Sequence, residues 1–168
     1  ERNAFMSNGA ASAMKAGLST ADIISTVSKT YGYEMQTHEN GYGLDWLLRQ
    51  RSNKLFGIVN GVDFDVWNPE TDVEIPHHFN KFDLSGKREN KRALLERFSL
   101  PIDLDRPIFF FLSRLTSQKG IELIQEVAWD ILSTGAYFIS LGSGDKSYEN
   151  FFQKMRDVVP NQVGSFTG

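Results

Sequence analysis

The sequence contains no cysteine and only three histidines among its 168 residues. The absence of cysteine excludes thiolate catalysis, cysteine–zinc sites and disulfide bonds. His77 and His78 are adjacent, and His38 lies about forty positions away with no partner at a ligand spacing. We therefore expect that the protein uses no metal ion, and we expect no other cofactor either.

Long apolar runs and blocks of positive charge are also missing. The longest apolar run lies around Ile108 to Leu112, far below the ~20 residues that a membrane-spanning helix needs. The 18 lysines and arginines stand against 21 acidic residues, for a formal net charge of −3. No cationic block matches a nucleic-acid backbone, so we expect a soluble protein that binds neither membranes nor nucleic acids.

The overall composition is that of a folded domain. Hydrophobic residues make up 40% of the chain and charged residues 23%, both ordinary values for a globular protein. The chain begins with Glu1 rather than methionine and lacks the basic and apolar regions of a signal peptide. We interpret it as a segment of a longer protein.

From Pro107 onward, strand and helix patterns alternate. Apolar runs separated by single amphipathic helices predict an α/β fold with a parallel sheet and helices on both faces. We expect strands at 107–112, 136–141 and 162–166, and helices at 121–132 and 148–158. Open parallel sheets usually carry about five or six strands, so this doubly wound domain is expected to be truncated.

The first hundred residues predict a second body of the same class. We expect helices at 10–21 and 30–35, strands at 23–27 and 55–59, and a short helix at 90–98 that leads into the second domain. The polar, proline-containing stretch between the two bodies lacks periodicity and is interpreted as a linker.

Two loops after predicted strands are candidate binding elements, because ligands of open α/β sheets bind at the carboxyl ends of the strands. Arg114 and Lys119 bracket the loop before the 121–132 helix, whose N-terminus already favours an anion. A guanidinium and an ammonium group there suit a diphosphate. Two solvated loop charges would give the same pattern, so the spacing alone leaves both interpretations open.

The second loop is Gly142-Ser143-Gly144. Its glycines leave no side chain to block the backbone, so its amides could contact a nucleotide or a sugar, although a plain tight turn explains it equally well. No GxxxxGK[ST] motif is present, and Ser147 stands where a dinucleotide fingerprint has its third glycine. Neither a P-loop NTPase nor a nicotinamide dehydrogenase is therefore supported.

Aromatic residues are expected mainly in the core. Phe109, Phe110, Phe111 and Phe138 lie in predicted strands. Trp67 stands among polar residues of the linker, and we expect its ring to pin the linker to one of the domains.

Several segments together resemble one family, the bacterial glycogen synthases and plant starch synthases. These retaining glucosyltransferases extend an α-1,4-glucan from a sugar nucleotide. The segments, in the family's order, are ADIISTVSKTYGYEMQT, ENGYGLDWLLRQRSNKLFGIVNGVDFDVWNPETD, RENKRALLERFSLP, FLSRLTSQKG and LGSGD.

The resemblance implies a GT-B architecture, in which two Rossmann-like domains face each other across a cleft. Residues 1–62 would be the C-terminal part of the acceptor-side N-terminal domain, and 63–88 the interdomain linker. Residues 89–168 would be the first half of the C-terminal nucleotide-sugar-binding domain. The resemblance also implies a soluble protein of the bacterial cytoplasm or of a plastid.

The resemblance assigns roles residue by residue. Arg114 and Lys119 match the family's basic pair on the distal phosphate of ADP-glucose, and Asn60 matches an active-site asparagine at the cleft. Gly142, Ser143 and Gly144 match the glycine loop on the nucleotide side. The resemblance implies that the parent protein is an enzyme. The family's Lys-x-Gly-Gly-Leu motif and its later glutamate motif are missing from this segment, so the segment alone is expected to be inactive.

Two alternatives stay open. Another GT-B glycosyltransferase can share an Arg-Leu-x-x-x-Lys-Gly loop, and only NGVDFDVWNPETD argues against it. A non-catalytic module that binds a sugar nucleotide or a glucan is the other. The sequence does not distinguish ADP-glucose from UDP-glucose as the donor.

Overall fold

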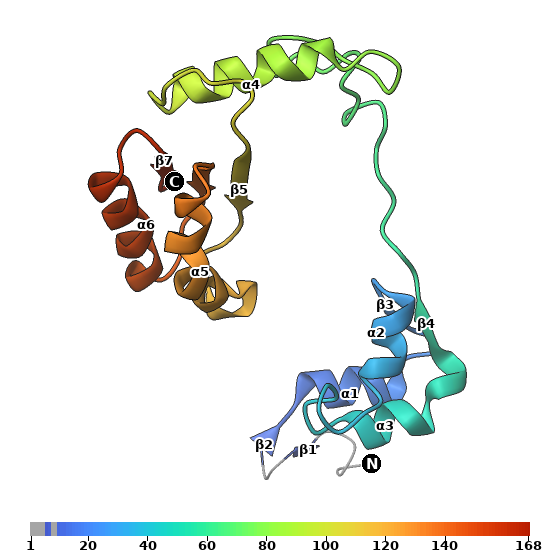
Figure 1. The fold of residues 1–168 in the computed structure, drawn as a ribbon. Helices are drawn as coiled ribbons and strands as arrows, with labels where there is room; N and C mark the ends of the chain where they lie inside the picture. The colour runs from blue at the N-terminus through green and yellow to red at the C-terminus, as the bar shows by residue number, and fades with distance from the viewer. Residues whose placement is uncertain (1–5, 8–9) are drawn as a thin grey trace. The chain divides into compact units, whose positions relative to one another are not determined.

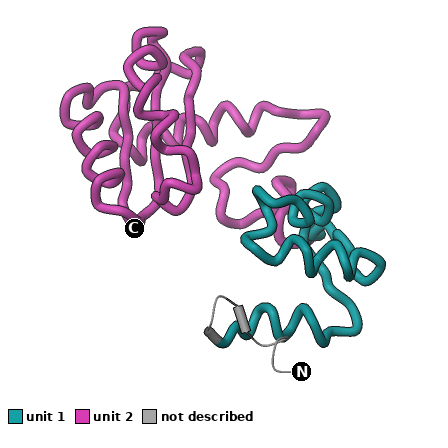
Figure 2. The backbone as a smooth tube through the Cα atoms, turned by 90° about the horizontal axis from the view of Figure 1, so that it is seen from below, with its two compact units in different colours: residues 1–64 teal, residues 65–168 magenta. Residues whose placement is uncertain are grey.

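The computed structural model describes residues 6–7 and 10–168. The chain forms two compact units, residues 1–64 and residues 65–168 (Figure 2). Each unit contains parallel strands connected through helices, which confirms the expected α/β class.

Unit 1 is built around a parallel pair of strands, β3 (Ile24–Thr26) and β4 (Leu55–Gly57). A short antiparallel pair, β1 (Met6–Ser7) and β2 (Ala10–Ala11), precedes them. The helices of this unit are α1 (Ala13–Thr20), α2 (Lys29–Glu34) and α3 (Asp45–Gln50), and a 3₁₀ turn covers Ser52–Lys54 (Figure 1).

Serine caps set the start of the first two helices. The Ser12 hydroxyl accepts from the Lys15 amide at 3.2 Å, and the Ser28 hydroxyl accepts from the Tyr31 amide at 3.1 Å. α1 therefore begins at Ala13 and not at the predicted residue 10, because Ser12 closes its N-terminus. α2 lies one residue before its predicted position, and the two strands lie where the sequence predicted them but are shorter.

Helix α3 was missed by the sequence analysis. Its six residues are too few for a full amphipathic pattern, but the spacing of Leu44, Leu47 and Leu48 is a helical signal. Leu47 and Leu48 are buried, and the carboxylate of buried Asp45 pairs with Arg49 at 2.7 Å. Burial of these leucines thus stabilises a helix that propensity alone does not predict.

The irregular segment 65–84 of unit 2 is organised by asparagine and aspartate turns. Asn80 Oδ1 accepts from the amides of Phe82 and Asp83, and Asp83 Oδ1 accepts from the Ser85 amide. Two hydrogen bonds, at 3.0 and 2.7 Å, join the Asn90 side chain to the backbone of His77.

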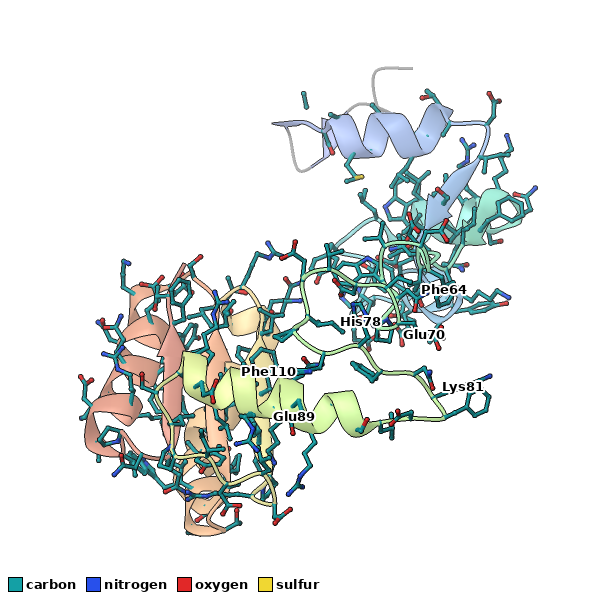
Figure 3. The ribbon with its side chains drawn as sticks, turned by 90° about the horizontal axis from the view of Figure 1, so that it is seen from above. Phe64, Glu70, His78, Lys81, Glu89 and Phe110 are labelled. Carbon is teal, nitrogen blue, oxygen red and sulfur yellow. The ribbon has the colours of Figure 1, made fainter. Side chains whose placement is uncertain are left out.

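Helix α4 (Ser85–Arg97) follows this segment. It begins five residues before the predicted start at Asn90, so residues 85–88 of the predicted linker are helical. The first turn of α4 is polar and charged and shows no apolar periodicity, so the sequence did not predict that the helix begins this early. In Figure 3, Glu70 and His78 mark the irregular segment and Glu89 marks the helix.

The sheet of unit 2 contains β5 (Ile108–Leu112), β6 (Tyr137–Leu141) and β7 (Val163–Phe166), all parallel and in the order β5-β6-β7. The connections are α5 (Ile121–Ser133) and α6 (Lys146–Val158). All five elements confirm the predictions to within two residues.

The two faces of this sheet are covered by different helices. Phe138 packs with residues of α5 and α6. The preceding and following residues, Tyr137 and Ile139, point to the opposite face and pack with Leu95 of α4. Phe152 of α6 lies at the centre of the first core, and its ring contacts Phe111, Phe138 and Phe151 at centroid distances of 5.9, 5.9 and 5.2 Å.

Two expectations about aromatic residues were wrong. Phe109 and Phe110 are 45% and 51% exposed. Among the described strands β5 pairs only with β6, so it is an edge strand and its side chains are less covered. Phe111 and Phe138 do contribute to the core. Trp67 is 71% exposed, so its ring does not pack into unit 2, the unit that contains it. No helix in the described ranges is long and apolar enough to cross a membrane.

Replacing Phe152 by alanine tests the core. Because this ring is fully buried among three other rings, Phe152→Ala is expected to lower the free energy of unfolding by about 3–5 kcal/mol. Phe110→Ala removes an identical side chain from a half-exposed position and should cost about 1 kcal/mol or less. Urea denaturation of the three proteins checks this, and equal losses in both variants would contradict the described core.

Candidate functional site

The loop between β5 and α5 carries both predicted cationic residues. Arg114 follows the end of β5, and Lys119 closes a 3₁₀ turn, Ser117–Lys119, directly before α5. Both side chains are exposed. The free amides of a helix N-terminus carry partial positive charge and favour anions. Both cationic residues lie in the loop that leads into the N-terminus of α5, at the carboxyl edge of the sheet.

The loop between β6 and α6 is joined to this basic loop by its backbone. The Leu115 amide donates to the Ser143 carbonyl at 2.8 Å, and the Asp145 amide donates to the Leu115 carbonyl at 2.8 Å. Leu115 and Gly144 form an isolated parallel bridge. The parallel pairing of β5 and β6 thus continues beyond the strands, and it brings Arg114 and the glycine loop into one place as the topology predicted.

The two glycines permit this close contact. A Cβ atom on Gly142 would lie 1.9 Å from the Ser113 carbonyl oxygen, and one on Gly144 would lie 2.2 Å from the Leu115 carbonyl oxygen. Any side chain at either position would therefore push the loops apart. The sequence left open whether these glycines serve a ligand or a plain turn. In the structure they allow the backbone of the 113–115 segment to lie against the glycine loop.

A buried carboxylate that the sequence analysis missed lies under the glycine loop. Glu149, in the first turn of α6, accepts from the Gly144 amide at 3.0 Å and from Lys146 Nζ at 2.5 Å. These hydrogen bonds lower the pKa of the Glu149 carboxyl below its usual value, and the bond from Lys146 has the larger effect. An acidic residue in the first turn of a helix was the available signal.

The first turns of α5 and α6 are also joined. The Tyr148 hydroxyl donates a hydrogen bond to Glu122 Oε1. This bond lowers the pKa of the Glu122 carboxyl and raises the pKa of the Tyr148 hydroxyl. Glu122 also brings an acidic group into the first turn of α5, so the site combines two exposed cations with one nearby carboxylate.

Asn60 lies in unit 1, where it is exposed three residues beyond the end of β4. Arg114, Lys119 and the 142–144 loop all lie in unit 2. The role of Asn60 at a shared cleft therefore stays a prediction. Within the described residues, no group of three or more histidine, aspartate or glutamate side chains could hold a metal ion.

Replacing Gly144 by alanine tests the contact between the loops. Because the new Cβ would overlap a backbone carbonyl of Leu115, Gly144→Ala is expected to destabilise unit 2 by about 1–3 kcal/mol. Hydrogen exchange of the Leu115 amide should become faster. Gly17→Ala is the control, since nothing lies within 4 Å of its Cβ, and unchanged Leu115 exchange in Gly144→Ala would contradict the described contact.

The shifted pKa of Glu149 predicts a pH-dependent stability. Because the pKa is lower in the folded protein, ionised Glu149 stabilises the fold above the unfolded-state pKa of about 4.3, and this contribution is lost as the pH falls through the folded value. Glu149→Gln should therefore be less stable than the wild type at pH 7 but approach it in acid. Urea midpoints measured at several pH values check this, and a pH-independent difference would contradict it.

Comparison with known proteins identifies relatives for most of the chain. The family described as the starch synthase catalytic domain matches residues 1–50. The chain is 47% identical over 152 residues to the glycogen synthase of Streptococcus sanguinis (strain SK36), covering 90% of this chain and 32% of that protein. It is 45% identical over 158 residues to the glycogen synthase of Kosmotoga olearia, covering 94% of this chain and 33% of the relative.

A solved structure matches both the fold and the sequence. The catalytic domain of starch synthase IV from Arabidopsis thaliana, bound to ADP and acarbose, matches with a TM-score of 0.85 and 34% identity over 92% of this chain and 32% of that one. The chain thus spans about a third of the length of the relatives that it matches. It carries a coherent portion of their sequence and fold, and it belongs, as a segment, to the glycogen synthase and starch synthase family.

Proposed function

We propose that the chain is part of a retaining glucosyltransferase that moves glucose from ADP-glucose to the non-reducing 4-hydroxyl of an α-1,4-glucan. The observation that carries the proposal is the presence of exposed Arg114 and Lys119 in the loop before α5, which is paired through Leu115 with the backbone of the glycine loop. The solved relative holds ADP and acarbose, which favours an adenine nucleotide as the leaving group.

Within this proposal, the units have different tasks. Residues 1–62 belong to the acceptor-side domain and 63–88 to the connection, while 89–168 form the first half of the nucleotide-sugar-binding domain. Asn60 would face the reacting sugar from the acceptor side. The bacterial sources of the glycogen synthase relatives favour the cytoplasm as the location of the protein.

The chemistry follows from the charge that develops on the leaving diphosphate. When the bond to the anomeric carbon breaks, negative charge accumulates on the distal phosphate. Arg114 can donate two parallel hydrogen bonds to its oxygens, and Lys119 adds a compact positive charge. Preorganised donors of this kind stabilise the transition state more than the ground state, so we propose that the reaction needs no metal ion.

The other half of the cleft is needed for transfer. Closing an active site excludes water, which would otherwise compete with the glucan as acceptor. The remaining two thirds of the relatives' length lie outside this segment. We therefore propose that the segment alone binds the nucleotide weakly and transfers no glucose.

Binding of ADP to the segment tests the proposal. Arg114→Ala and Lys119→Ala are each expected to weaken ADP binding by about 1–3 kcal/mol, because each removes charged hydrogen bonds. An NMR titration of labelled protein detects even weak binding and should shift the amides of residues 113–120 and 142–145.

Lys154→Ala serves as the control, since it removes an exposed positive charge from α6. The proposal requires that this variant binds ADP like the wild type. ADP affinity that is the same in Arg114→Ala, Lys119→Ala and the wild type would refute the assignment of the basic loop.

A further inference from the structure

Glu149 is a carboxylate in an unusual position, because its side chain is almost fully buried. The residue is only 4% exposed, and acidic residues are rarely buried without a specific partner. One partner, the Lys146 side chain, is 83% exposed, and ion pairs with a solvated member contribute little. The fixed partner is the Gly144 amide at 3.0 Å.

The Gly144 amide belongs to the stretch of backbone that pairs with the basic loop. Gly144 bridges to Leu115, and its neighbours Ser143 and Asp145 take both backbone hydrogen bonds of Leu115. Leu115 itself is buried in the core and directly follows Arg114. A continuous set of contacts therefore runs from the Glu149 carboxylate through Gly144 and Leu115 to the backbone of Arg114.

A helix cap is the simpler explanation for Glu149. A carboxylate in the first turn of α6 interacts favourably with the helix dipole. However, this carboxylate accepts from an amide outside the helix, since Asp145 is the N-cap and Gly144 precedes it. The hydrogen bond from Tyr148 to Glu122 also holds the start of α6, so α6 keeps a second attachment when Glu149 is changed.

We propose that Glu149 is a positioning residue for the diphosphate-binding loop. By holding the Gly144 amide, it fixes the backbone pairing with Leu115 and so the point from which the Arg114 side chain extends. The inference rests on the proposed function, because it assumes that Arg114 contacts the leaving diphosphate. Glu149 itself touches neither the nucleotide nor the sugar.

Two variants of the full-length protein separate the acceptor from the volume of the side chain. In Glu149→Gln, the amide oxygen can still accept from the Gly144 amide. Glu149→Met keeps a similar volume but accepts no such hydrogen bond. We expect Glu149→Met to raise the Kd of ADP and the KM of ADP-glucose about tenfold or more, and Glu149→Gln to raise them by less than about threefold.

The KM of the glucan acceptor is the internal reference. A positioning role changes the parameters of the nucleotide and leaves the glucan KM unchanged. A cap alone would lower the fraction of folded enzyme, which reduces the maximal rate but changes neither KM nor Kd. Glu126→Gln, on an exposed position of α5, is the matched control and should behave like the wild type.

NMR spectra of Glu149→Gln give a second readout that does not require Glu149→Met to fold. The proposal expects a shift at the Gly144 amide, which contacts residue 149 directly, with the Leu115 and Arg114 amides nearly unchanged because glutamine keeps the acceptor. An unshifted Gly144 amide would overturn it. Unchanged ADP affinity in Glu149→Met would overturn it as well. The failure of the proposed function is distinct, because Arg114→Ala would then also bind ADP like the wild type.

Discussion

The backbone contact between the loops that follow β5 and β6 determines the geometry of the candidate site. Leu115 donates to the Ser143 carbonyl and accepts from the Asp145 amide, both at 2.8 Å. This pairing exists because two glycines remove the side chains that would lie between the loops. The basic residues extend from a loop whose buried anchor, Leu115, is part of the core. The position of Arg114 therefore depends on the packing of the sheet and helices behind it.

Much of the fold was predictable because its elements have strong local patterns. The three parallel strands of unit 2 and the helices α5 and α6 lie where apolar periodicity placed them. The errors have physical causes. α3 is six residues long and is stabilised by burial of Leu47 and Leu48, which periodicity over a short window does not resolve. Phe109 and Phe110 were expected inside, but the strand order puts β5 at the side of the sheet, and strand order is not contained in local sequence.

The candidate site was predictable only in part, for a similar reason. Arg114, Lys119 and the 142–144 loop could be grouped from the sequence, since loops after neighbouring parallel strands meet at one edge. The hydrogen bond from Gly144 to Glu149 could not, because it depends on where α6 begins and which way its first turn faces. A glutamate in that turn looks like an ordinary helix-stabilising residue. Its burial and its contact outside the helix distinguish it.

A site of this kind suits a reaction whose charge develops on a leaving diphosphate. Stabilising such charge requires donors that already point at it, because reorienting flexible cations during the reaction would cost free energy. Arginine and lysine side chains are long and flexible, so the precision must come from their backbone. Here the backbone is fixed by pairing between loops, by the buried Leu115 and, on our proposal, by the Glu149 carboxylate beneath Gly144. Rigid support under an exposed basic pair is what preorganisation requires of such a loop.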